Sequence, residues 1–540
     1  TGRINGASVS LPPSDLGFGH TRWATHGGVT EGNAHPHLDC AGRLAVVHNG
    51  IVENHRALRD ELLARGHRFR SETDSEVIAH LLEERVGAGA DLATAVREAF
   101  ARLDGLNAIV AMDVVSRELV ATKNVSPLVA GLGRHGTVIA SDAIALMPHT
   151  ARVLYLEDGQ LLRANRDGVA LYDRATLAPA DARFAPIDWD AASAELGAYS
   201  HFMTKEMAEQ PAVIERLARD GRSQIEALAA RMRTSTHVVL TGCGTAANAA
   251  LAGQYLIGRI ARRAVTMIPA SEFRYHATPL GPDTLVVAFS QSGETVDLIE
   301  AALAAKRSGA TLAAVVNCPR STLDRMADLH VHLGAGPEQC VLATKSYTAK
   351  VAALILIASA LHGEYARGAD IVNGAAKALG NMLAVDAVNI VKGIARRIDA
   401  AEHMFVIGRG AAYPTALEAA LKIKEASYIH AEGFAGGELK HGVIALVADG
   451  TPCLVFVPHD ETRADILSGA AELKSRGGFL IGVGPEPDPV FDAFIATPDA
   501  GDGAPIVNAL PAQMLAYHAA LLRGADPDRP RNLAKSVTVK

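Results

Sequence analysis

The stretch HVVLTGCGT, residues 237–245, joins an apolar run to a G-x-G turn, and it recurs at 403–411 as HMFVIGRGA. Two further pairs of stretches recur in the same order: LVVAFSQSGET (285–295) with LVFVPHDET (454–462), and GATLAAVVN (309–317) with GGFLIGVGP (477–485). The offset within each pair stays at about 166 to 169 residues. Apolar strands that alternate with helical segments are typical of a parallel sheet buried on both faces. We therefore predict two copies of one doubly wound α/β domain.

The chain on either side of this repeat has a different pattern. Up to about residue 184, short β-rich runs punctuated by Gly and Asn lie between helical patterns, which indicates a separate α+β domain. The predicted order is 1–184, the α+β domain; 185–205, a linker; 206–370 and 371–525, the two α/β copies; and 526–540, a C-terminal tail.

Composition narrows the class of protein. At 540 residues the chain is too long for one core, and a net charge of −7 argues against a general nucleic-acid binder. The five cysteines are far apart, with no CxxC or Cys/His cluster in the sequence, which argues for a reducing, cytoplasmic setting and against a metal such as structural zinc. The longest apolar run, 351–361, is short of the ~18 to 20 residues that span a bilayer. With neither a signal peptide nor a first methionine in view, we expect no membrane partner and a fragment or processed form.

The loop from Ser290 to Thr295 carries three hydroxyls, an amide and a glycine in six positions. A solvated turn is the plain interpretation. However, the loop follows a buried strand and opens a helix, so backbone N–H groups and the positive end of the helix dipole face any ligand. Three hydroxyls can donate hydrogen bonds to an oxyanion, and phosphate is the ligand that fits this pattern best. The second copy has PHDET at 458–462, with two carboxylates, so we expect only the first copy to bind phosphate.

Motifs along nearly the whole chain resemble known families. TGCGT, SQSGET and ATKSYT resemble the sugar isomerase (SIS) domain, which binds phosphosugars. ALEAALKIKEASYIHAEGFAGGELKHG and the tail PRNLAKSVTVK, together with GHTRWATHGGVTEGNAHPH and VVHNGIVENH, resemble the glutamine–fructose-6-phosphate aminotransferase (isomerizing) family. The resemblance implies an α+β glutaminase domain of the N-terminal-nucleophile type, followed by two α/β SIS domains.

The resemblance also implies a reaction and its partners. Fructose 6-phosphate would become glucosamine 6-phosphate through a Schiff base and a ketose–aldose isomerisation, with ammonia from L-glutamine. This is the first step of the hexosamine (UDP-N-acetylglucosamine) pathway. The resemblance implies no cofactor, and a homodimer whose active sites are built between subunits.

Four residues of the second copy and the tail would carry this chemistry: Lys422, Glu425, His441 and Lys535. The resemblance gives Glu425 the proton transfer between C1 and C2, His441 the opening of the sugar ring, and Lys535 the Schiff base. Lys422 and Glu425 share a helix face at i, i+3, where a surface ion pair is the plain alternative. A turn histidine and a solvated tail lysine are the alternatives for the other two. A Schiff-base lysine needs a depressed pKa, so the tail must fold near other cations or apolar walls, and Lys422 is a candidate neighbour.

The phosphosugar would be held mainly by the first copy. The residues expected to bind it are Ser290, Gln291, Ser292, Thr295, Thr245 and Val341. The chain departs from the family at Ala246 and Ala343, where the family has serine. Each missing hydrogen bond is worth ~1 kcal/mol, so the affinity for the sugar, or the identity of the sugar, is open.

The glutamine site would lie in the first domain. The residues that match the family are Arg22, Trp23, Thr25, His26, His35, Asn49, Gly50 and Asp74. Arg22 would pair with the glutamine carboxylate and Asp74 with its amino group, while Asn49 and the Gly50 N–H would form the oxyanion hole. Trp23 matches the gate of an ammonia channel. For Asn49-Gly50, a simple hairpin turn is the alternative.

The family's nucleophile is a cysteine at the mature N-terminus. Here the chain begins inside that domain, Cys40 cannot supply a terminal amine, and Thr1 leads into no apolar strand. We therefore expect an incomplete glutaminase domain, short of some β-strands, that does not hydrolyse glutamine in this chain.

Two other classes of protein stay open. The first is a phosphosugar isomerase or deaminase that uses free ammonia or none, which Ala246, Ala343 and the missing cysteine motivate. The second is a sugar-phosphate sensor. The four candidate catalytic residues disfavour a sensor, and no basic helix-turn-helix segment is evident.

Overall fold

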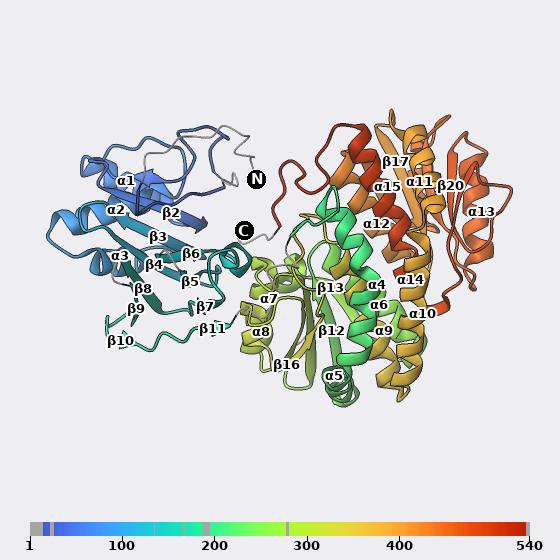
Figure 1. Ribbon diagram of the computed structural model, residues 1–540, viewed down its shortest axis with the longest axis horizontal. Helices are drawn as coiled ribbons and strands as arrows, with labels where there is room; N and C mark the ends of the chain where they lie inside the picture. The colour runs from blue at the N-terminus through green and yellow to red at the C-terminus, as the bar shows by residue number, and fades with distance from the viewer. Residues whose placement is uncertain are drawn as a thin grey trace. The chain divides into compact units, whose positions relative to one another are not determined.

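The computed structural model describes residues 14–21, 26–133, 136–165, 168–186, 195–276 and 280–535. These residues form two compact units, an N-terminal unit that ends at 186 and a C-terminal unit that begins at 195. Each unit has its own sheets (Figure 1).

The N-terminal unit contains two antiparallel sheets. The larger one has the strand order β1 (His37–Leu38), β2 (Leu44–Gly50), β3 (Asn107–Asp113), β4 (Glu118–Asn124), β8 (Gln160–Asn165), β9 (Gly168–Asp173) and β10 (Pro179–Ala180). The smaller one has the order β11 (Ala185–Pro186), β7 (Arg152–Tyr155), β5 (Val129–Gly133) and β6 (Gly136–Ala140).

Alternation along the strands gives the larger sheet two apolar faces. Leu44 and Val46 of β2 pack in one cluster with three helices, which are α1 (His55–Ala64), α2 (Glu76–Gly87) and α3 (Leu92–Phe100). Ala45 points to the opposite face, where a second cluster contains residues of β5 and β7. The unit is therefore a helix–sheet–sheet sandwich, as expected for side chains that alternate with a period of two. The prediction that this domain lacks strands stays a prediction.

The C-terminal unit contains two parallel five-stranded sheets of the same order. The first is β13 (Thr266–Pro269), β12 (His237–Gly242), β14 (Thr284–Ser290), β15 (Thr311–Val316) and β16 (Leu329–His332). The second is β18 (His430–Ala435), β17 (His403–Gly408), β19 (Pro452–Phe456), β20 (Phe479–Gly484) and β21 (Ala493–Ala496). Each stretch of the sequence repeat supplies the matching strand of its sheet, so the prediction of two doubly wound copies is confirmed.

Helices cover these sheets and join the two copies. The longer helices are α4 (Phe202–Asp220), α5 (Arg222–Thr234), α6 (Thr245–Ala261), α7 (Val296–Arg307), α9 (Lys345–His362), α10 (Tyr365–Met382), α11 (Val385–Ile398), α12 (Ala412–Ser427), α13 (Arg463–Lys474) and α15 (Ala509–Leu522). Helix α9 is buried along all but its last residue. Helix α6 packs on both α9 and α12, and one apolar cluster contains residues of both copies.

None of the described helices is, by itself, long and apolar enough to cross a membrane. The segments Tyr365–Met382 and Asp386–Ile398 meet that length and composition only when taken together, and the chain bends by 69° between them.

Candidate active site

The loop at Ser290–Thr295 joins the carboxyl end of the central strand β14 to α7. The buried Ser290 and Ser292 hydroxyl oxygens accept hydrogen bonds from the N–H groups of Gly293 (2.8 Å) and Glu294 (3.1 Å). Gly293 has φ +70°, and a Cβ there would lie 2.0 Å from the Ser321 hydroxyl oxygen. The loop is thus fixed by its own serines, and only glycine fits at its apex.

Two side chains of this loop can donate hydrogen bonds to a ligand. The buried Nε2 of Gln291 has no hydrogen-bond partner among the described residues. Thr295 precedes α7, and its hydroxyl makes no capping bond to the helix. An amide, a hydroxyl and the N-terminal N–H groups of a helix suit an anion at the end of a central parallel strand.

A buried carboxylate of the second copy contacts the corresponding turn at the start of α6. Thr245 donates its hydroxyl to Glu418 at 3.0 Å, and Asn248 donates its amide to the other Glu418 oxygen at 2.9 Å. Burial raises the pKa of Glu418. Thr245, which we expected at the phosphosugar, is therefore bonded to Glu418 in this structure.

Lys422 and Glu425 lie on the same face of α12 and are joined at 2.5 Å. The Lys422 side chain is 1% exposed, and its Nζ also lies 3.6 Å from Glu418. Burial opposes the charge, but the two carboxylates outweigh it and raise the pKa of Lys422. The alternative of a surface ion pair is wrong, because the lysine is enclosed and only Glu425 reaches solvent, with 20% of its side chain exposed.

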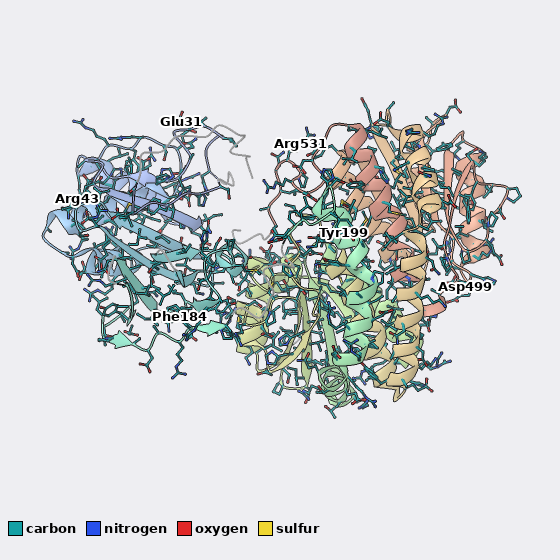
Figure 2. All side chains as sticks on the ribbon, viewed as in Figure 1. Glu31, Arg43, Phe184, Tyr199, Asp499 and Arg531 are labelled. Atoms are coloured by element: carbon teal, nitrogen blue, oxygen red, sulfur yellow. The ribbon has the colours of Figure 1, made fainter. Side chains whose placement is uncertain are left out.

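The C-terminal segment is folded against the second copy and α4. The Arg531 N–H donates to the Tyr428 hydroxyl at 2.8 Å, and the Arg531 guanidinium lies 4.1 Å from the centre of the Tyr428 ring. Arg531 is labelled on this segment in Figure 2. The Val341 N–H donates to the Asp528 carbonyl at 3.0 Å, and the Asp528 carboxylate accepts the first N–H groups of α4. The tail is therefore docked rather than solvated.

Docking of the tail brings Lys535 to a buried carboxylate. Its Nζ lies 2.8 Å from Glu338 and 2.7 Å from the Cys340 carbonyl oxygen. Glu338 is fully buried and also accepts hydrogen bonds from the Thr344 N–H and from the Ser346 N–H and hydroxyl. Although burial opposes its charge, the positive charges of Lys535 and Lys350, together with the hydrogen bonds from Lys535 and the Ser346 N–H, lower the pKa of Glu338 to about 2.

The charge on Lys535 differs from the expectation. Burial favours the neutral amine, but Glu338 outweighs it and raises the pKa of Lys535. The predicted depressed pKa is wrong for this structure, because the neighbour is a carboxylate. Lys422, the expected neighbour, is paired with Glu425 and Glu418 instead.

Sequence reasoning missed two ionisable residues in this region. Burial and the nearby Glu338 raise the pKa of Glu206, on α4, to about 8. Burial lowers the pKa of Lys350, on α9, to about 8, and this lysine interacts electrostatically with Glu338, Lys535 and Glu418. Lys350 therefore interacts electrostatically both with the Lys535–Glu338 pair and with Glu418 on α12. A lysine at the edge of the apolar run 351–361 was the signal that could have found it.

His441 lies apart from these groups. It ends a short 3₁₀ helix, Glu438–His441, and its side chain is exposed. Within the described part of the chain, no hydrogen bond or ion pair joins it to Lys535, Glu425 or the loop at Ser290.

The structure describes five of the eight residues predicted for the glutamine site. Arg22, Trp23 and Thr25 are outside the described residues. Nδ1 of His26 lies 3.7 Å from the buried Asp74 carboxylate, which also accepts the Val52 N–H at 2.8 Å.

His20 contacts two of the other predicted residues, Asn49 and His35. It hydrogen-bonds the Asn49 side-chain oxygen at 2.8 Å, and its ring lies 4.2 Å from the ring of His35. The structure therefore brings His26 close to Asp74, and it brings both Asn49 and His35 to His20.

Asn49 and Gly50 end strand β2 and pair with Ala108 and Asn107 of β3, so the alternative of a hairpin turn is wrong. Gly50 has φ +144°, and a Cβ there would lie 2.1 Å from the Leu106 carbonyl oxygen. Glycine is required here by backbone approach.

His48, which the sequence did not indicate, precedes these two residues in β2. It is buried and hydrogen-bonds Ser75 at 2.8 Å and Asn107 at 2.9 Å. Burial lowers its pKa.

Comparison with known proteins identifies both units. The SIS domain family model matches residues 231–360 and 398–523, and the glutamine amidotransferase domain model matches residues 20–148. Among solved structures, the C-terminal domain of glucosamine-fructose-6-phosphate aminotransferase from Francisella tularensis is 31% identical with a TM-score of 0.58, covering 62% of this chain and 99% of that one. A putative phosphosugar isomerase from Silicibacter pomeroyi is 25% identical with a TM-score of 0.54, covering 61% and 100%.

Fold and site thus define a glutamine amidotransferase domain joined to two SIS domains. The chain is 41% identical over 536 residues to glutamine–fructose-6-phosphate aminotransferase (isomerizing) of Pyrococcus horikoshii, covering 98% of this chain and 90% of the relative. The enzyme of the same name from Thermus thermophilus is 42% identical over 543 residues, covering 97% and 89%. The chain belongs to the glutamine–fructose-6-phosphate aminotransferase (isomerizing) family, as its motifs predicted.

Proposed function

We propose that this chain converts fructose 6-phosphate and ammonia to glucosamine 6-phosphate and water, the first step of the hexosamine pathway. Family membership supports the reaction, and one observation carries the mechanism. The tail lysine, Lys535, is held in a buried carboxylate site beside Lys350, whose charge also interacts with the Glu418 of α12. This buried carboxylate site supports a role for Lys535 as a nucleophile rather than as a solvated side chain.

The first step fixes the sugar and forms the Schiff base. The Ser290–Thr295 loop holds the phosphate, with the free Gln291 amide as one donor. The Lys535 amine attacks the C2 carbonyl of the open-chain ketose, and water leaves as the C=N bond forms. Because Glu338 keeps the lysine protonated in the resting site, this step requires that the ammonium first lose a proton.

The second step transfers nitrogen and isomerises the sugar. Ammonia replaces the lysine at C2, which restores the free amine of Lys535. Glu425 then removes a proton from C1 and returns it to C2, giving the 2-amino aldose. Lys422, enclosed beside it, fixes the position of that carboxylate.

The proposed ring opening requires a second copy of the chain. His441 is exposed and is not joined to the other catalytic candidates by any contact among the described residues. We therefore assign the histidine of each site to the partner in a homodimer. Residues 526–540 are assigned as a catalytic tail, and we propose a cytoplasmic setting.

The source of ammonia is a separate question. L-glutamine fits the group of His26, Asp74 and Asn49 in the N-terminal unit. Cys40, the cysteine of that unit, lies instead against His67 and His80.

A second candidate is an isomerase or deaminase that acts on a related 6-phosphosugar. The observation that favours it is alanine at 246 and 343, beside the start of α6 and of α9. Two hydroxyls that would bond the anchored sugar are absent, at ~1 kcal/mol each.

The test is to incubate the full chain with fructose 6-phosphate alone, with ammonium, or with glutamine. Glucosamine 6-phosphate formed with ammonium is the expected result, and its formation with glutamine would show that the N-terminal unit supplies the ammonia. Glucose 6-phosphate as the sole product, with or without ammonium, would favour the isomerase. Saturable binding without any product would overturn both and favour a sensor.

A further inference from the structure

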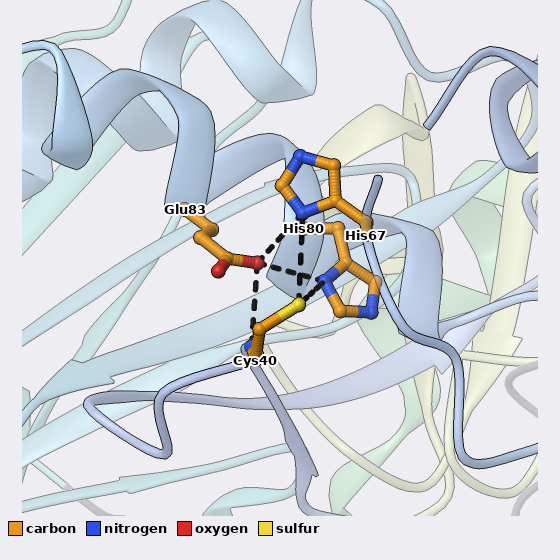
Figure 3. A group of neighbouring side chains, drawn as sticks. All are labelled: Cys40, His67, His80 and Glu83. Carbon is orange, nitrogen blue, oxygen red and sulfur yellow. Dashed lines mark hydrogen bonds and ion pairs between the residues drawn. The ribbon is translucent and has the colours of Figure 1, made fainter. Parts of the chain in front are cut away.

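Four side chains of the N-terminal unit, from three separate segments, converge on one point, and none of them is among the residues predicted for the glutamine site. Cys40 lies in the turn before β2, His67 follows α1, and His80 and Glu83 share one face of α2 at i, i+3. Their ligand atoms, the thiol sulfur, two Nδ1 atoms and one carboxylate oxygen, lie within 4.8 Å of one another. Figure 3 shows all four groups directed at the same small space.

The distances approach those of a tetrahedral metal site. The sulfur lies 3.8 Å from Nδ1 of His67 and 3.7 Å from Nδ1 of His80. The carboxylate oxygen lies 2.8 and 2.9 Å from the same two nitrogens. Usual zinc bond lengths and tetrahedral angles require separations of about 3.3 to 3.6 Å between ligand atoms. Side-chain movements of less than about 1 Å would therefore complete the tetrahedron.

The outer faces of both imidazoles support this arrangement. Nε2 of His67 lies 3.5 Å from Glu84, and Nε2 of His80 lies 3.7 Å from Glu76. A ligating histidine typically presents its second nitrogen to a carboxylate, which fixes the ring and strengthens it as a donor. Each histidine here thus has Nδ1 toward the centre and Nε2 toward a carboxylate. The Arg68 N–H also lies 3.3 Å from the sulfur, where it would stabilise a thiolate.

We propose that Cys40, His67, His80 and Glu83 bind one zinc ion. A thiolate, two imidazoles and a carboxylate form a donor set of intermediate softness that suits Zn²⁺ rather than Mg²⁺ or Ca²⁺. Four protein ligands leave no open position, so the site is structural. The ion would tie the turn before β2 and the segment after α1 to α2, the helix that follows Asp74 and Ser75 at the glutamine site.

A second cluster in the C-terminal unit serves as the internal comparison. Asp324 lies 2.9 Å from Nδ1 of His330 and 3.0 Å from Nε2 of His332. It offers three ligands, no thiol, and both histidines on one edge strand. Its substitution therefore controls for weak metal binding elsewhere on the full chain.

The experiment measures the metal content of the full chain after loading with ZnCl₂ and desalting. We expect about one zinc per chain in the wild type and in the control variant H330A/H332A. Cys40→Ser and His80→Gln should each lose at least ten-fold in affinity, and Glu84→Gln, which changes only the outer carboxylate, about 10- to 100-fold. Sub-stoichiometric zinc in the wild type, or loss of zinc only in H330A/H332A, would overturn the proposal.

A spectroscopic measurement on the wild type tests the proposal without relying on any variant to fold. Cobalt(II) bound by the wild type should show a thiolate-to-cobalt charge-transfer band together with the ligand-field bands of a tetrahedral site. Cobalt bound without the thiolate band would exclude Cys40 and contradict the assignment. The hydrogen-bonded network of Glu83 with both histidines would then be a purely structural tie without an ion.

Discussion

The Lys535 ammonium lies 2.8 Å from the fully buried Glu338 carboxylate, while 22% of the Lys535 side chain is exposed. This pairing raises the pKa of the lysine that we propose as the nucleophile. The resting site is therefore charged and stable, and substrate binding has to release a proton from the lysine before the Schiff base can form.

This relationship predicts a shift in the pH dependence of catalysis. A carboxylate raises the pKa of an adjacent lysine, so Glu338→Gln should lower it. The pH at which kcat/KM rises should then move down by about one unit or more. The measurement is the pH–rate profile of ammonia-dependent synthesis. Glu209→Gln, which removes a carboxylate paired with Lys345, is the matched control and should leave the midpoint in place. An unchanged midpoint in Glu338→Gln would contradict this role.

The raised pKa of Glu206 predicts how stability varies with pH. Its folded pKa is about 8 and its ordinary value is 4.5, so between these values the folded state retains a proton that the unfolded state has released. The free energy of unfolding therefore falls as the pH rises from 4.5 to 8.

Glu206→Gln should remove that slope, because the amide keeps an oxygen for the N–H groups of Gln339 and Cys340 but carries no titrating proton. Urea midpoints between about pH 5 and pH 8 should show the variant gaining at least about 1 kcal/mol relative to the wild type. Glu215→Gln, an exposed change on the same helix, should show no such gain. If the free energy of unfolding varies with pH in the same way for Glu206→Gln and the wild type, the folded state does not retain a proton on Glu206.

The asymmetry of the repeat predicts which threonine binds phosphate. Thr295 makes no capping bond, so Thr295→Ala should cost substrate binding without weakening α7. Loss of ~1 kcal/mol corresponds to a KM for fructose 6-phosphate raised about five-fold. Thr462 occupies the same place in the second copy, where its hydroxyl donates to Asp460 at 2.6 Å. Equal effects of Thr295→Ala and Thr462→Ala on KM would refute the assignment of phosphate to the first copy.

The close contact between Gly50 and the backbone of Leu106 predicts that a larger residue at position 50 destabilises this region. Gly50→Ala places a Cβ 2.1 Å from the Leu106 carbonyl oxygen at φ +144°, and should cost at least about 2 kcal/mol. Hydrogen exchange of the amides in β2 and β3 should become faster. Gly87→Ala, at the end of α2 with no atom within 4 Å of its Cβ, should be neutral or stabilising. If the amides of β2 exchange no faster in Gly50→Ala, the strand accommodates the added Cβ without loss of stability, and the prediction is wrong.

Local patterns predicted most of the fold. The repeat spacing placed β12 and β17, β14 and β19, and β15 and β20 correctly, because each strand is a continuous apolar run buried on both faces. Alternation along β2 likewise separates the two apolar clusters of the N-terminal unit. Whether a segment forms a strand depends largely on residues that are close together in the sequence, so one sequence is enough to predict it.

Pairings between distant residues could not be predicted. Glu206 contacts Cys340 across 134 residues, and Lys535 contacts Glu338 across 197. Neither pair leaves a local pattern, so the sequence suggested the wrong neighbour for Lys535. The Cys40 cluster was missed for the same reason, since its histidines follow at 27 and 40 residues. His441 was expected in the site, but the single chain leaves it on the surface.

In the proposed mechanism, Lys535 forms the Schiff base with the sugar. Incubating the full chain with fructose 6-phosphate and sodium borohydride, without ammonium, should reduce the C=N bond and leave the sugar phosphate attached to one lysine. Peptide mass spectrometry should find the adduct on Lys535, with Lys350 and Lys422 unmodified, and Lys535→Met should yield no adduct. An adduct on Lys350, or full synthesis by Lys535→Met, would contradict the account.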